Sequence, residues 1–241
     1  MTRLRRLGVA GLALALLLSG CTAAPEPEPT WRPVTGEEAQ ILAVARFNNF
    51  DAGSRPFVTE VGEGDKMQHV QGWVDYSSQV GYAAASDPEQ PQAVLWTADS
   101  VGFLPADPDA DGNPVLPIPP FDDTWQTAAL APSDYALDAV LAVLSGLGSD
   151  RPDNPLLVQQ SGTLWLGRDE VDGVAVTLFA APPTDEARSP ADPPLTPDSA
   201  KLRLAVDDKG LLRRADVQFR GDWITIDLPD APAPALTLPT P

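Results

Sequence analysis

This chain of 241 residues offers few side chains that could perform chemistry, because it has one cysteine, Cys21, and one histidine, His69. A single cysteine excludes an intramolecular disulfide framework and a thiolate metal cluster. His69 lies near Gln68 and Gln71 in a predicted strand, and the chain has no Gly-x-Ser-x-Gly elbow. We therefore interpret His69 as a surface residue, and we expect neither an enzyme nor a bound cofactor.

Three carboxylates at alternating positions, Asp107, Asp109 and Asp111, precede Gly112 and resemble the start of an EF-hand calcium loop. The twelfth position of such a loop needs a bidentate glutamate, but Ile118 stands there. A solvated acidic turn is the interpretation that we favour. A calcium site at these three aspartates is the alternative.

The first twenty residues have the order of an export signal. Arginines at positions 3, 5 and 6 precede an uncharged apolar run over residues 7–18. As a helix this run spans roughly 18 Å, less than the ~30 Å hydrocarbon core of a bilayer. The run ends in Leu18-Ser19-Gly20-Cys21, which resembles the lipobox of bacterial lipoproteins. The sequence therefore predicts a signal peptide over residues 1–20 and a diacylglycerol on Cys21. An ordinary secreted protein with an incidental cysteine is the alternative.

The mature chain is strongly acidic. Removal of residues 1–20 takes three of the 16 basic residues and none of the 34 acidic ones, so the net charge changes from −18 to −21. Such a balance argues against a nucleic-acid partner and against a body that lies flat on anionic lipid. Residues 21–34, rich in proline and glutamate, predict an extended lipidated spacer. We expect a protein tethered to the outer face of the cytoplasmic membrane.

Two helices are predicted. Thr35 and Glu38 have the spacing of a capping box, which places a helix start at Thr35. A second helix is expected over residues 133–147, and its apolar stripe includes Leu137, Leu141 and Leu144.

Strand patterns fill most of the remaining chain. They cover residues 55–61, 68–77, 80–86, 93–104, 161–168, 174–180, 201–206, 211–219 and 222–228. Asp172 and Gly173 form a type I′ hairpin signal, whose register places Leu166 opposite Phe179. The sequence therefore predicts an α+β fold: a strongly curved antiparallel sheet, a half-barrel of about eight to eleven strands, with helices covering its concave face.

Three segments lack such patterns. Residues 106–120 and 182–199 are rich in proline and are predicted to be surface loops. Residues 231–241 are predicted to be an untethered tail. One folded domain is thus expected over residues 35–230.

The order of these features resembles a known family. A lipobox and a Pro-rich arm precede a helix and the strand motif Val70-Gln71-Gly72-Trp73-Val74-Asp75-Tyr76. The motifs Gly162-Thr163-Leu164-Trp165-Leu166-Gly167 and Leu202-Arg203-Leu204-Ala205-Val206-Asp207 follow the second helix. This pattern is similar to the LolA-like superfold, in particular to actinobacterial lipoproteins of the LppX/LprAFG type. The resemblance implies an apolar cavity that carries a lipid or lipoglycan through the envelope.

The residues expected to line such a cavity come from the second helix and from the inner faces of the predicted strands. They are Leu137, Leu141, Leu144, Val74, Tyr76, Leu166, Phe179, Ile224 and Ile226. The sequence leaves a second possibility open, in which these side chains fill the core. The protein would then be an anchored, non-enzymatic module that docks a protein partner or senses the state of the envelope.

Overall fold

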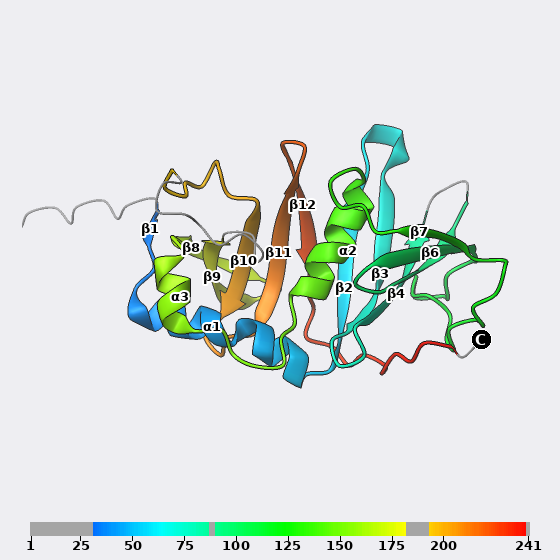
Figure 1. The fold of residues 1–241 in the computed structure, drawn as a ribbon, viewed down its shortest axis with the longest axis horizontal. Coiled ribbons are helices and arrows are strands. Elements are labelled where there is room, and N and C mark those ends of the chain that lie inside the picture. The colour runs from blue at the N-terminus through cyan, green and yellow to red at the C-terminus, as the bar shows by residue number, and fades with distance from the viewer. Residues whose placement is uncertain (1–30, 87–89, 182–192, 240–241) are drawn as a thin grey trace, which may run out of the picture.

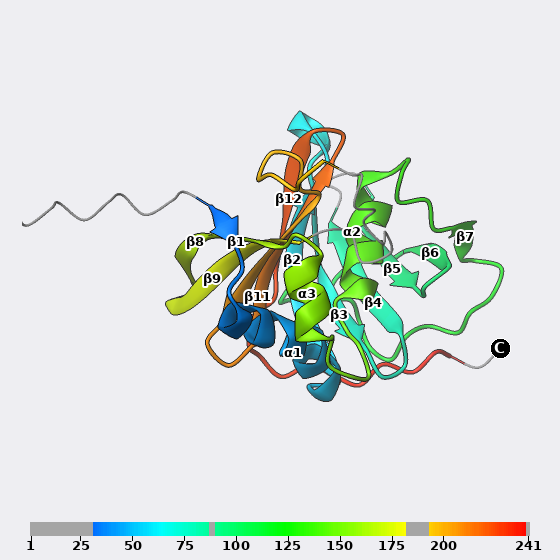
Figure 2. The same cartoon turned by 60° about the vertical axis from the view of Figure 1, so that its left-hand side comes forward.

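Twelve antiparallel strands form one curved, open sheet in this computed structural model, which describes residues 31–86, 90–181 and 193–239 (Figure 1). The strand order is β1-β8-β9-β10-β11-β12-β2-β3-β4-β5-β6-β7, so that β1 and β7 are the edges. Helices lie on one face of this sheet (Figures 1 and 2). The predicted α+β class, with a curved antiparallel sheet and helices on one side, is confirmed. The predicted signal peptide and Cys21 lie outside the described residues.

The sheet consists of two meanders. The first contains β2 (Ser54–Val61), β3 (Gln68–Asp75), β4 (Val80–Ser86), β5 (Gln92–Trp96), β6 (Ser100–Pro105) and β7 (Gln126–Ala129). The second contains β8 (Leu164–Val171), β9 (Val174–Ala181), β10 (Leu202–Asp207), β11 (Leu212–Phe219) and β12 (Asp222–Asp227). The short strand β1 (Arg32–Pro33) pairs with β8 at the free edge of the second meander.

A narrow junction joins the two meanders. The ladder between β12 and β2 contains the pairs Ile226↔Thr59 and Asp227↔Val58. Beyond these pairs the buried guanidinium of Arg55 on β2 donates to the carbonyl oxygens of Leu228, at 2.8 Å, and Leu212, at 3.1 Å. A side chain thus supplies hydrogen bonds to buried backbone carbonyls where the ladder ends.

Helix α1 (Gly36–Asp51) begins as predicted. The side chain of Thr35 accepts a hydrogen bond from the Glu38 backbone, and the Glu38 carboxylate accepts one from the Thr35 backbone at 2.8 Å. Arg32 adds two bonds of 2.7 Å to the same carboxylate. These bonds from Arg32, together with those from Thr35, lower the pKa of Glu38 to about 2.

Helix α2 (Ala136–Gly146) begins later than predicted, after Tyr135, whose side chain forms no capping bond. The carboxylate of Asp138 instead accepts a hydrogen bond from the backbone N–H of Ala131 at 2.8 Å, which fixes the segment that precedes the helix. Helix α3 (Pro155–Gln160) was not predicted. It is too short to show an apolar period, although Asn154 caps it and Pro155 occupies its first turn.

The β8–β9 hairpin forms at Asp172 and Gly173 as predicted, but its register changes farther along. The ladder pairs Gly167 with Leu178 and then Trp165 with Phe179, because Leu166 lies in a β-bulge. Gly167 has a φ of +137°, which a residue with a Cβ rarely adopts. The predicted pairing of Leu166 with Phe179 is therefore wrong, and Leu166 points to the opposite face of the sheet from Trp165.

The predicted strand over residues 93–104 is two strands, because β5 and β6 form a hairpin that turns at residues 97–99. The alternation of apolar residues is the same on both sides of this short turn, so the sequence pattern does not reveal where one strand ends and the next begins. The edge strand β7 was also missed, since its four residues are all exposed and carry no alternation of apolar side chains.

Both faces of the sheet are covered. The largest buried cluster lies between the inner face and the helices, whereas a second cluster lies on the outer face around Tyr82 and Leu95. The Pro-rich segment after β6 covers this outer cluster with Ile118 and Trp125. The C-terminal segment lies there too: Leu236 is buried, and its N–H donates to the Asp75 carboxylate at 2.9 Å (Figure 2). The expectation of a free tail is thus corrected for the described residues up to 239.

Candidate functional site: an apolar cavity between the helices and the second meander

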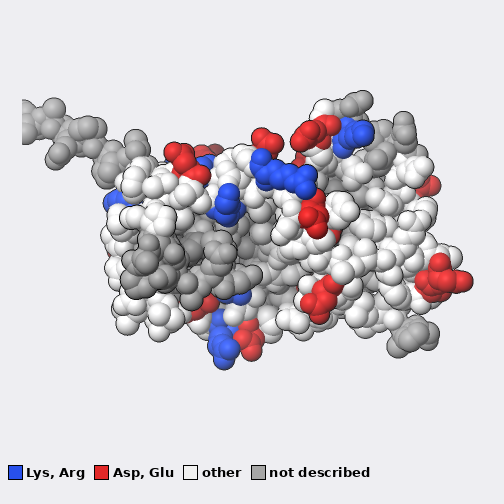
Figure 3. All heavy atoms as spheres, turned by 45° about the horizontal axis from the view of Figure 1, so that its top comes forward, with Lys and Arg blue, Asp and Glu red and all other residues white. Residues whose placement is uncertain are grey.

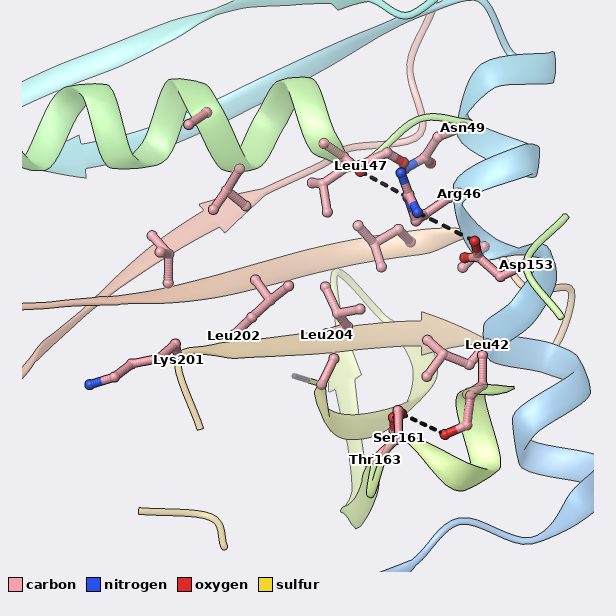
Figure 4. A pocket seen from close by; sticks show the side chains of 18 of the residues that line it. Leu42, Arg46, Asn49, Leu147, Asp153, Ser161, Thr163, Lys201, Leu202 and Leu204 are labelled. Carbon is pink, nitrogen blue, oxygen red and sulfur yellow. Dashed lines mark hydrogen bonds and ion pairs between the residues drawn. The ribbon is translucent and has the colours of Figure 1, made fainter. Parts of the chain in front are cut away.

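A cavity of about 660 Å³ lies between the three helices and the inner face of the second meander (Figure 4). Its apolar wall comes from strands β10 and β11 on one side and from helices α1, α2 and α3 on the other. The lining includes Leu42, Ala45, Ala139, Ala142, Val143, Leu147, Leu157, Val158, Leu202, Leu204, Leu212 and Val217. A volume of this size and an apolar lining are typical of sites for small organic ligands.

Small residues create this space. Ala139, Ala142 and Gly146 recur at helical spacing along α2 and face the cavity, and Ala45 lies on α1. Here these small side chains do not reach the strands opposite, so space remains between α2 and the sheet. The strands opposite contribute Leu202 and Leu204, which point into the gap (Figure 4).

One end of the cavity is closed by a polar network. Arg46 on α1 donates from Nε to the carbonyl oxygen of Gly146 at 2.9 Å, and its Nη1 lies 3.3 Å from Asp153 Oδ1. Asn49 donates to the carbonyl oxygen of Leu147 at 2.9 Å. These bonds fix the chain between α2 and α3 to α1, so that the cavity has a rigid end with its charges paired (Figure 4).

Arg55 extends this network into the core. Its Nη1 donates to Asn49 Oδ1 at 2.7 Å, which orients the Asn49 amide toward Leu147. Burial lowers the pKa of Arg55, yet the guanidinium keeps four acceptors within hydrogen-bond distance. The charge of Arg55 is thus satisfied by oxygens and does not extend into the cavity.

The opposite side of the cavity is open to solvent, since its lining includes the exposed residues Ser133, Leu157 and Lys201. Lys201 lies at the start of β10 and points away from the cavity, and its Nζ donates to Gln218 Oε1 at 2.8 Å (Figure 4). Acidic and basic side chains lie side by side along the upper edge of the face drawn in Figure 3. Three described residues that line the cavity are charged, Arg46, Asp153 and Lys201, and the first two pair with each other.

The side chains predicted to line a cavity lie elsewhere. Leu141, Leu144, Phe179 and Ile226 are fully buried in the inner cluster. Leu137 and Ile224 are partly buried and pack against that cluster, whereas Leu166 packs on the outer face. None of the nine predicted residues is among those that line the large cavity of the described structure.

Val74 and Tyr76 line a different space. It has about 510 Å³, lies on the other side of the residues that follow α2, and is bordered mostly by polar groups, including Asp75, Ser77, Ser145 and Ser149. Burial raises the pKa of Tyr76, whose hydroxyl has no hydrogen-bond partner among the described residues. The polar lining of this second cavity does not suit an alkyl chain.

The predicted calcium turn is held by its own backbone. Asp109 Oδ1 accepts from the N–H groups of Asp111 and Asn113, at 2.9 and 2.8 Å, and Gln71 donates to the Asp111 carbonyl oxygen at 2.8 Å. Over the described ranges, no three His, Cys, Asp or Glu side chains gather as metal ligands would. His69 Nε2 lies 3.0 Å from Gln71 Oε1 on the outer face of β3.

The sequence contained one signal for the cavity that the prediction overlooked. The large apolar residues of α2 at helical spacing, which the sequence predicts to line the cavity, fill the core. The small residues of the neighbouring face, Ala139, Ala142 and Gly146, recur with the same period. In this helix, the stripe of small residues lies on the side where space remains, and the stripe of large residues lies on the side that fills the core.

Comparisons with known proteins find similar structures but no sequence match. No protein-family model matches the chain, and no curated protein sequence matches it. Among solved structures, the chain is similar to LprF from Mycobacterium bovis, with 16% identity over 87% of this chain and 99% of that chain, and a TM-score of 0.43. It is similar to the lipoprotein LppX from Mycobacterium tuberculosis, with 13% identity over 82% and 98%, and a TM-score of 0.39.

A DUF1329 family protein from Desulfovibrio piger is also similar, with 10% identity over 81% of this chain and 90% of that chain, and a TM-score of 0.32. Within the described part of the chain, no helix has the length and apolar character needed to cross a membrane.

Proposed function

We propose that this chain is an envelope lipoprotein, attached through a lipid on Cys21 to the outer face of the cytoplasmic membrane, that holds an apolar ligand such as a lipid or lipoglycan. The observation that carries the proposal is the open cavity of about 660 Å³ with an apolar wall. Its role is carriage or presentation of the ligand, without catalysis.

The contacts of the cavity support an alkyl ligand. An alkyl chain gains about 25 cal/mol for each Å² of apolar surface that leaves water, provided that the wall offers no unpaired polar group. The polar groups at the closed end have partners. Arg46 donates to the Gly146 carbonyl oxygen and to Asp153, and Asn49 donates to the Leu147 carbonyl oxygen. A polar head group is accommodated at the open side, near Ser133 and Lys201.

The test is native mass spectrometry of the chain from residue 22 onward, produced in a bacterium and purified without detergent. The four buried clusters lie between Val34 and Leu236, so this chain contains the whole described core. We expect added mass from co-purified lipid, which lipid extraction then identifies. Ala142→Phe places a ring in the cavity from α2 and should reduce that mass.

Ala129→Phe is the matched control, because Ala129 is exposed on the edge strand β7 and does not line the cavity. It should keep the bound lipid. If neither the unmodified chain nor the control carries or takes up lipid, the cavity has no such ligand. The protein would then be better explained as an anchored module for a protein partner.

A further inference from the structure

Helix α3 exposes two large apolar side chains side by side. Leu156 is 64% exposed and Leu157 is 62% exposed, although leucine is among the residues most often buried. The helix has the sequence Pro-Leu-Leu-Val-Gln-Gln and carries no charge. Its other side packs on α1, and Val158 contacts the inner cluster. The outward face of α3 is thus apolar and uncharged without a partner within the described chain.

Helix α3 lies at the same end of the molecule as β1, where the described chain begins (Figure 1). Three residues after α3 the chain begins β8, whose Leu164 pairs with Pro33 of β1, and the N–H of Val34 donates to the Thr163 carbonyl oxygen at 3.3 Å. Trp31, the first described residue, is 42% exposed. Tryptophan suits a membrane–water interface, because its ring is apolar and its N–H remains hydrated.

The tether keeps this end close to the bilayer. Nine residues, 22–30, separate Cys21 from Trp31. Fully extended, the ten steps from Cys21 to Trp31 reach at most about 36 Å. The charges near the start of α3 occur as opposite pairs, Arg46 with Asp153 at 3.3 Å and Arg151 with Asp150 at 3.9 Å. These four side chains therefore add no net charge beside Leu156 that would repel phospholipid head groups.

The same helix borders the opening of the cavity. Leu157 and Val158 line it, whereas Leu156, one residue earlier, does not. A surface that touches lipid at Leu156 thus places the opening against the lipid, and a ligand could pass between bilayer and cavity without crossing bulk water. That passage avoids the full cost of exposing an alkyl chain to water.

We propose that the exposed face of α3, formed by Leu156 and Leu157, is a membrane-docking surface that applies the cavity opening to the bilayer holding the anchor. The partner is the phospholipid surface itself. The inference rests on the attachment through Cys21 and on the ligand role proposed above, and its test separates these from docking.

The first measurement follows the environment of a fluorophore. The chain from residue 22 onward lacks cysteine, so Leu156→Cys can be labelled with an environment-sensitive nitrobenzoxadiazole probe. An N-terminal histidine tag attaches it to phosphatidylcholine vesicles that contain a nickel-chelating lipid. Val115→Cys, which is 53% exposed on the outer face, is the labelled control. We expect a blue shift for the probe at 156 on attachment and no shift at 115. A probe at 156 that stays in water, or equal shifts at both sites, overturns the proposal.

The second measurement follows transfer of a pyrene-labelled phosphatidylcholine from the same vesicles. Leu156→Ser should slow uptake roughly tenfold, because one leucine contact with the bilayer is lost, while the amount bound at equilibrium is unchanged. Gln159→Ser, an exposed position on the same helix, is the control and should keep the rate. Unchanged uptake by Leu156→Ser contradicts docking but leaves the ligand role intact. A blue shift at 156 without uptake by any variant supports docking and rejects the ligand role.

Discussion

Arg46 and Gly146 join the two long helices at the closed end of the cavity, through a hydrogen bond of 2.9 Å from Arg46 Nε to the Gly146 carbonyl oxygen. Gly146 is the last residue of α2, so its carbonyl has no partner within the helix. The guanidinium supplies that partner and also pairs with Asp153, just before α3. A single side chain of α1 thus sets the positions of the other two helices that border the cavity.

Arg46→Leu should therefore destabilise the protein by about 1–3 kcal/mol, because a half-buried carbonyl and a carboxylate lose their donor. Urea unfolding followed by tryptophan fluorescence measures the change. Arg151→Leu is the control, since the Arg151 side chain is 86% exposed and its pairing with Asp150 is long. Equal losses in the two variants would show that the bond to Gly146 adds no stability.

Gly81→Ala tests the packing of Trp96 on the inner face. The indole ring of Trp96 lies directly on Gly81, where a Cβ would overlap it, and its Nε1 donates to Ser145 on α2 at 3.1 Å. The added methyl group should force the ring away and cost about 1–3 kcal/mol of unfolding free energy. Gly36→Ala, at a position with open space around it, should be neutral or slightly stabilising. Thermal unfolding measures both variants. A similar loss of melting temperature in Gly36→Ala would show that replacement of a glycine, and not overlap with Trp96, causes the destabilisation.

Leu236→Ser tests whether the C-terminal segment belongs to the fold. Leu236 is 3% exposed and packs with Tyr82, Leu95 and Trp125 on the outer face. Loss of this side chain should lower the unfolding free energy by about 2 kcal/mol or more. Leu238→Ser, two residues farther along and 46% exposed, should change it little. Similar unfolding midpoints for both variants would mean that this segment does not stabilise the sheet.

The ion pair at the start of α1 predicts a pH dependence. Hydrogen bonds from Arg32 and Thr35 lower the pKa of Glu38 from 4.5 to about 2. A carboxylate whose folded pKa is depressed stabilises the fold above its unfolded pKa, and this contribution is lost as the pH falls through the folded value. The loss attributable to Glu38 should thus occur between pH 4.5 and about 2.

Glu38→Gln should flatten the decline of stability in that window, as measured by urea unfolding at a series of pH values. Glu37→Gln is the control, because Glu37 is exposed and adjacent in sequence. A decline that is as steep in Glu38→Gln as in the unmodified chain contradicts this role of the ion pair.

Local signals predicted the elements of this fold well where one signal dominates. The capping box of Thr35 and Glu38 fixes the start of α1, and the turn at residues 207–210 separates β10 from β11 as expected. The predictions failed where tertiary packing overrides a local pattern. The bulge at Leu166 and the burial of Leu236 depend on partners remote in sequence, which no local period reveals.

The candidate site was harder to predict than the fold. An apolar stripe tells which side of a helix is buried, but it does not tell whether side chains meet across the interface or leave room. On α2 the stripe of Leu141 and Leu144 meets the sheet, and the room lies beside Ala139 and Ala142. That distinction depends on the separation of helix and sheet, which is a property of the whole assembly.

The two ladder pairs between β12 and β2 give the sheet a seam. The cavity lies entirely on the side of the second meander. A shift of β9, β10 and β11 relative to the helices therefore changes the width of the cavity, while the first meander keeps its hydrogen bonds. The guanidinium of Arg55 bridges the seam with bonds to main-chain oxygens, and a side chain can follow small shifts that a rigid ladder would resist. We therefore expect the cavity to accommodate ligands of different widths through movement of β9, β10 and β11. The first meander and the segments packed on the outer face would keep their positions.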